Sequence, residues 1–137
     1  MTAALTGLVD SHCHLDRLDL KDYPGGLAEL MQATAAAGVD HMLCIGVDLE
    51  SFPAVRDLAE RYPNVHCTVG VHPLYRDSRE PTCAELVQLS EHPRVVAIGE
   101  TGLDYFYAKD DTRWQRQRFA EHIAAARQTG LPLVVHT

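Results

Sequence analysis

Five short apolar runs, separated by segments with helical signals, are the feature that most limits what this chain can fold into. The runs are rich in β-branched residues and span residues 8–14, 41–47, 65–71, 95–100 and 131–136. Runs of this length and composition are typical of buried strands. Strand and helix alternate four times before the fifth run, which is the pattern of a parallel α/β sheet.

The segments between the runs carry the start and stop signals of helices. Four apolar residues repeat at helical spacing before Pro63, namely Val55, Leu58, Ala59 and Tyr62. Two residue pairs have the spacing of a capping box, Thr82 with Glu85 and Thr112 with Gln115. Segments 27–37 and 112–129 are each followed by a glycine, a residue that commonly lies just after a helix. We therefore expect four helices between five strands.

The first run distinguishes two kinds of parallel α/β fold. No glycine-rich phosphate loop follows it, which argues against a doubly wound nucleotide-binding sheet. The run carries His12 and His14 instead, which favours a TIM-type (β/α)8 barrel. A complete barrel needs about 250 residues, and this chain has 137. We expect residues 1–137 to supply about five strands and four helices, as the N-terminal part of one barrel domain.

Composition excludes some classes of protein and leaves others open. The net charge of −7 argues against a simple DNA-binding module, but it is compatible with a metalloenzyme because bound cations offset acidic groups. The four cysteines form no CxxC pair, so we expect buried thiols rather than a disulfide framework. Residues 1–10 lack a signal-peptide pattern, and no run reaches the roughly 18 apolar residues of a membrane helix. These features predict a soluble cytoplasmic protein with no membrane partner.

Two histidines of the first run have the spacing of metal ligands on a strand. Strand side chains alternate, so Asp10, His12 and His14 share one face. If that face points into the barrel, both imidazoles are presented to one ion. Alone, an HxH pair is equally compatible with two half-buried strand histidines.

A carboxylate and a third histidine end later runs. Glu100 ends the fourth run, where alternation places it on one face with Val96 and Ile98, and His136 ends the fifth. A carboxylate can bridge two cations, which histidine cannot do. Taken singly, Glu100 could be a solvated carboxylate and His136 a histidine near the chain end. Their coincidence at strand C-termini favours a divalent-metal hydrolase site.

Other polar residues are less specific. His72, in GVHP at the start of a loop, is equally compatible with contact to a substrate oxygen and with a turn histidine. His122 is expected to be structural or on the surface. In TRWQRQRF we expect the arginines to lie on a solvated helix face, although phosphate contact is conceivable, while Phe119, Ile123 and Ala126 pack inward. The arginines are Arg113, Arg116 and Arg118.

Four motifs together resemble one known family. LVDSHCHLD (8–16) resembles the N-terminal signature of the TatD family of metal-dependent deoxyribonucleases, and GVHP (70–73) and IGETGLDY (98–105) match in order and spacing. LPLVVHT (131–137) resembles the start of a further signature. The HxH motif is shared with amidohydrolase-like barrels and PHP phosphoesterases, whereas IGETGLDY separates TatD proteins from them. The resemblance covers the whole chain.

The resemblance implies a (β/α)8 barrel that hydrolyses phosphodiester bonds of DNA, or RNA, as a 3′–5′ exonuclease. By this resemblance His12 and His14 bind a first divalent cation, His136 binds a second, and Glu100 bridges them. The cations would be zinc, manganese or magnesium, roughly 3.5–4 Å apart, and would activate a water for in-line attack. His72 and Asp104 are candidates to position the substrate. The family's remaining ligands, a histidine and an aspartate that is the general base, have no counterpart in these 137 residues.

Two alternatives remain open. A related metal-dependent esterase, such as an aminoacyl-tRNA deacylase, would release an amino acid instead of nucleotides. A non-catalytic fragment would show little turnover. Because a five-stranded part of a barrel has two unpaired edges, we also expect the chain to self-associate or aggregate.

Overall fold

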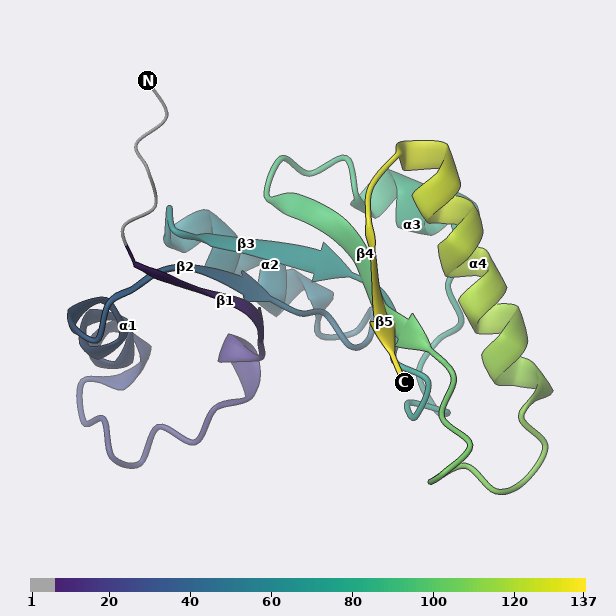
Figure 1. Cartoon of the computed structure of the whole chain (residues 1–137), viewed down its shortest axis with the longest axis horizontal. Coiled ribbons are helices and arrows are strands. Elements are labelled where there is room, and N and C mark those ends of the chain that lie inside the picture. The colour runs from purple at the N-terminus through teal and green to yellow at the C-terminus, as the bar shows by residue number, and fades with distance from the viewer. Residues whose placement is uncertain (1–6) are drawn as a thin grey trace.

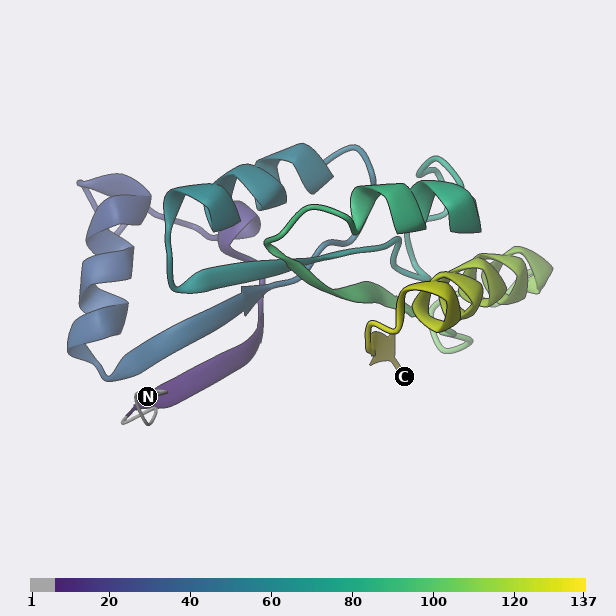
Figure 2. The same cartoon turned by 90° about the horizontal axis from the view of Figure 1, so that it is seen from above.

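The computed structural model describes residues 7–137 as one curved parallel sheet with its helices on the convex side (Figures 1 and 2). The strands are β1 (Leu8–Cys13), β2 (Val39–Cys44), β3 (Val65–Val69), β4 (Val95–Gly102) and β5 (Leu133–His136). They lie in chain order, and every neighbouring pair is parallel. This is the arrangement of five consecutive strands of a (β/α)8 barrel, which confirms the expected fold class. Within the described residues, β1 and β5 each pair along one edge only.

Four helices connect the strands. They are α1 (Gly26–Ala36), α2 (Phe52–Arg61), α3 (Cys83–Leu89) and α4 (Arg113–Thr129), and a short 3-10 turn, η1 (Leu15–Arg17), follows β1. Helix α4 ends at Gly130, whose φ of 74° is in the left-handed region that favours glycine. Thr82 caps α3 by accepting a hydrogen bond from the Glu85 amide, as expected. The second capping box is wrong: Thr112 makes no side-chain cap, and the Gln115 side chain bonds to the backbone of Asp104 instead of reaching back to Thr112.

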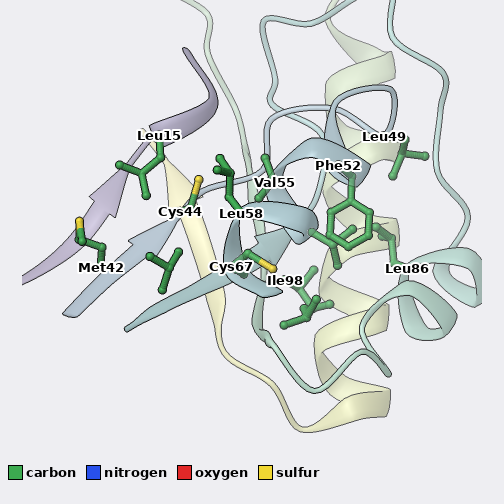
Figure 3. Packing of buried hydrophobic residues seen from close by; sticks show 14 of the residues in the cluster. Leu15, Met42, Cys44, Leu49, Phe52, Val55, Leu58, Cys67, Leu86 and Ile98 are labelled. Carbon is green, nitrogen blue, oxygen red and sulfur yellow. The ribbon is translucent and has the colours of Figure 1, made fainter. Parts of the chain in front are cut away.

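The hydrophobic core fills the space between the sheet and the helices (Figure 3). Residues that contribute to it include Met42, Cys44, Cys67 and Ile98 from the strands and Phe52, Val55, Leu58 and Leu86 from α2 and α3. Full burial of such a side chain stabilises the fold by roughly 1.5–3 kcal/mol. Because strand side chains alternate, the residues between the core positions face the concave side of the sheet.

Strand β4 departs from this alternation. Its pairing with β3 slips before Ala97, and its pairing with β5 slips between Gly99 and Thr101. Ile98 therefore lies in the core, whereas Glu100 faces the concave side. The expectation that these two residues share a face is wrong.

All four cysteines are free. Cys44 and Cys67 are buried, as expected, and burial raises the pKa of their thiols to about 11 and about 12. Cys13 and Cys83 are only half-buried. No helix in residues 7–137 has the length and apolar character needed to cross a membrane. The expectation about a signal peptide rests partly on residues 1–6, which lie outside the described part of the chain.

Candidate metal centre

The four predicted metal ligands converge at the C-terminal ends of β1, β4 and β5. Together with His72 they form two groups in which one potential ligand atom per residue lies within 4.8 Å of the others. The first group is His12, His14 and Glu100, and the second is His72, Glu100 and His136. Glu100 belongs to both groups.

The Glu100 carboxylate divides its two oxygens between these groups. Its Oε2 lies 3.2 Å from His12 Nε2, and its Oε1 lies 3.3 Å from His136 Nδ1 and 3.7 Å from His72 Nε2. The side chain is almost fully buried. A carboxylate that faces imidazoles on both sides has the arrangement needed to bridge two cations.

Hydrogen bonds with the segment after β2 and with β3 fix the position of Glu100. Its amide donates to the Gly46 carbonyl at 2.8 Å. The buried Thr68 hydroxyl donates to the Gly99 carbonyl at 2.6 Å and accepts from the Gly46 amide at 3.0 Å. A Cβ at Gly70 would lie 2.6 Å from the Gly99 Cα, so this close approach of β3 and β4 requires glycine. Strand alternation places Thr68 on one face with Gly70 and His72, but it does not indicate the two contacts of the Thr68 hydroxyl.

The His14 ring is oriented for metal binding through one nitrogen. Its Nδ1 lies 3.2 Å from the Ile45 carbonyl, which can only accept, so Nδ1 carries the proton. The lone pair is then on Nε2. Histidines that bind metals usually donate their other ring N–H in this way. The ring of His12 packs edge-on against His14, with centroids 5.2 Å apart.

Asp104 lies against the His136 ring. Its Oδ2 is 2.8 Å from His136 Nε2, and its Oδ1 accepts from the amides of Phe106 and Tyr107, both at 3.0 Å. The Tyr107 amide and the His136 ring hold the pKa of this carboxyl below its usual range. An ionised Asp104 accepts Nε2–H and leaves His136 Nδ1, beside Glu100, free for a metal. The sequence indicated both residues but not their contact.

His72 has a different protonation pattern. Its Nδ1 accepts from the Leu74 amide at 3.1 Å, so the neutral ring carries its proton on Nε2. Burial, opposed in part by the Glu100 carboxylate, lowers the pKa of His72 and favours this neutral form. With Nε2–H directed toward the site, His72 is arranged as a hydrogen-bond donor rather than as a ligand.

A cavity of about 640 Å³ opens over these side chains. It is lined by His12, His14, Arg17, His72, Tyr75 and Glu100, among others. Its size is within the range of small-ligand sites. The donor set, imidazole nitrogens with a carboxylate, suits zinc, manganese or iron, so the residues present fit a divalent cation.

Comparison with known proteins identifies the family. The model of the family described as TatD related DNase matches residues 9–137. The chain belongs to the TatD family. It is 38% identical over 131 residues to the uncharacterized metal-dependent hydrolase YcfH of Escherichia coli K12, covering 95% of the chain and 49% of the relative. It is also 38% identical over 135 residues to the uncharacterized metal-dependent hydrolase TatD of Mycobacterium tuberculosis, covering 94% and 51%.

Solved TatD structures agree with the fold. YjjV, a TatD homolog from E. coli K12, superposes with a TM-score of 0.79 at 30% identity, covering 94% of the chain and 50% of YjjV. A TatD-family hydrolase from Entamoeba histolytica gives a TM-score of 0.78 at 23% identity, covering 96% and 50%, and supports the fold alone. The chain spans about half the length of the relatives it matches.

Helix α4 contributes a buried arginine next to the site, which the sequence pattern did not indicate. Arg118 is 2% exposed, and its Nη1 donates to the carbonyls of His72 and Tyr75 at 2.7 and 2.9 Å. The expectation of a solvated face is therefore wrong for Arg118, although Arg113 and Arg116 are exposed. The partners of Arg118 are carbonyls more than 40 residues away, which helical periodicity cannot indicate. Ile123, expected to pack inward, is exposed, while Phe119 and Ala126 are half-buried.

Proposed function

We propose that residues 1–137 form the N-terminal part of a TatD barrel that hydrolyses phosphodiester bonds in DNA with two divalent cations, as a 3′–5′ exonuclease. The observation that carries the proposal is the Glu100 carboxylate, which has His12 on one oxygen and His136 on the other. The names of the relatives, metal-dependent hydrolases, support metal-assisted hydrolysis. The family description, TatD related DNase, supports a DNA substrate.

In this proposal His12, His14 and Glu100 hold one cation, and Glu100 and His136 hold the other. Bound divalent cations supply Lewis acidity toward the phosphoryl oxygens and lower the pKa of water. Asp104 acts through His136, whose ring it orients. His72 donates its Nε2–H to a non-bridging oxygen of the scissile phosphate. It lines the cavity, and its neutral ring carries the proton on Nε2 because Nδ1 accepts from the Leu74 amide.

Exposed aromatic residues favour a polynucleotide over a small ester. Phe106 and Tyr107, in the loop after β4, are 70% and 71% exposed, and Tyr105 is also exposed. A second cavity, of about 440 Å³, lies between this loop and the loop after β3 and is lined by Leu74, Tyr107 and Trp114, among others. Stacking of a base on such a ring contributes about 1–3 kcal/mol. We assign this loop to contact with the bases next to the scissile phosphate.

The proposal is tested with Glu100→Gln, which keeps the size of the side chain and removes its charge. In the complete barrel, we expect this variant to lose Mn²⁺-dependent release of nucleotides from 3′-labelled single-stranded DNA and to bind Mn²⁺ much more weakly in calorimetry. Glu91→Gln is the matched control, because Glu91 is an exposed residue after α3, away from the site. Full activity of Glu100→Gln would refute the bridging role. Release of an amino acid from aminoacyl-tRNA, without nucleotide release, would establish the deacylase alternative.

A further inference from the structure

Helix α4 presents a row of buried polar side chains to the sheet. Gln115, Arg118 and His122 are each 2% exposed or less, at spacings of three and four residues that place them on one face. A helix that packs on a sheet normally presents apolar residues there. A buried polar group destabilises the fold unless it is hydrogen-bonded. All three side chains are bonded to backbone groups of the loops that carry the site.

Gln115 holds the backbone of Asp104 at both ends of the residue. Its Oε1 accepts from the Asp104 amide at 2.8 Å, and its Nε2 donates to the Asp104 carbonyl at 3.0 Å. The Asp104 carboxylate in turn contacts His136 Nε2. Gln115 is thus two contacts away from a proposed metal ligand and does not line the cavity above the site.

Arg118 and His122 hold the backbone on either side of His72. His122 Nδ1 lies 2.7 Å from the Arg118 carbonyl and must donate to it, so Nε2 has a lone pair, which accepts from the Val71 amide at 2.9 Å. Arg118 donates to the His72 carbonyl. Its charge is balanced by Glu80, to which it is also bonded. Neither residue lines the cavity above the site.

We propose that this face of α4 positions the two halves of the site separately: Gln115 sets the Asp104–His136 pair and hence metal affinity, whereas Arg118 and His122 set His72 and hence substrate binding. This inference deepens the proposed function and rests on it for the role of His72. All three are positioning residues, because none of them reaches the reacting atoms.

The separation predicts different outcomes for two substitutions on one helix. Gln115→Met removes both bonds to Asp104 at similar side-chain volume. We expect it to weaken Mn²⁺ binding about tenfold in calorimetry, since loss of a group that orients a metal ligand typically costs 10–100-fold. His122→Leu removes the acceptor for the Val71 amide. We expect it to raise the KM of the complete barrel for single-stranded DNA about tenfold and to change Mn²⁺ affinity less than twofold.

Conservative and distant variants separate positioning from general destabilisation. His122→Gln offers an amide oxygen in place of Nε2 and should restore KM. Leu58→Ala, in the core contributed by α2, should lower stability but leave both Mn²⁺ affinity and KM unchanged. If Gln115→Met and His122→Leu changed both quantities alike, or matched Leu58→Ala, separate positioning would be refuted.

A spectroscopic measurement keeps the inference testable without turnover. Nitrogen-15 spectra of the His72 ring should show protonation on Nε2 in the unsubstituted protein and in His122→Gln, and a mixture of tautomers in His122→Leu. Unchanged His72 signals in His122→Leu would overturn the role of His122. Unchanged Mn²⁺ affinity in Gln115→Met would overturn that of Gln115. If the complete barrel hydrolysed no DNA, the proposed function would fail, and these two measurements would still decide the positioning roles.

Discussion

Acid should destabilise the protein through His122 in a way that can be calculated. Burial lowers the pKa of this ring from 6.5 to about 4. The folded state therefore keeps His122 neutral at pH values where the unfolded chain has already taken up a proton. This contribution to stability is fully present above pH 6.5 and is lost as the pH falls toward 4. Each pH unit between the two values costs about 1.4 kcal/mol, so the loss approaches about 3 kcal/mol at pH 4.

The measurement is urea unfolding at several pH values between 7.5 and 4, for the unsubstituted protein and for His122→Gln. Other groups titrate in this range, but they are common to both proteins. The difference in unfolding free energy between the two should therefore shift by about 3 kcal/mol in favour of the variant as the pH falls. A difference that does not vary with pH would refute the assignment of a neutral, buried His122.

Three further perturbations follow from the structure. Thr68→Val removes the hydroxyl that joins Gly46 to Gly99 and should lower the unfolding free energy by about 1–3 kcal/mol; wild-type stability in urea unfolding would contradict this role. Phe106→Ala should weaken binding of single-stranded DNA by roughly fivefold or more, measured by fluorescence anisotropy, while Mn²⁺ affinity stays unchanged; equal DNA affinity would remove the loop from the substrate site. The 137-residue chain should self-associate through the open edges of β1 and β5, and Val135→Lys, on β5, should reduce this association; sedimentation of the unsubstituted chain as a monomer at all concentrations would contradict it.

The sequence predicted those parts of the structure that follow from local periodicity. All five strands and four helices are present, because each is an apolar run or an amphipathic segment with its own end signals. The convergence of His12, Glu100 and His136 followed from a topological rule, since the C-terminal ends of neighbouring parallel strands meet at one rim.

The features that the sequence did not reveal depend on contacts between distant segments. The core position of Ile98 depends on slips in strand pairing, which no alternation pattern records. The burial of Arg118 depends on carbonyls in the loop after β3. In the same way, Gln115 has the spacing of a capping box with Thr112. Its side chain instead forms hydrogen bonds with the backbone of Asp104, which precedes the helix.

The loop between β4 and α4 combines a fixed beginning with an exposed tip. Asp104 is held by Gln115 and His136, whereas Phe106 and Tyr107 extend into solvent. Exchanges of side chains at the tip keep the Phe106 and Tyr107 amides that bind the Asp104 carboxylate, and would therefore leave the proposed metal ligands in register. Substrate preference would then change without rebuilding the proposed metal site. The tip is accordingly the place to begin in a laboratory search for altered selectivity, with residues 104 and 115 held constant.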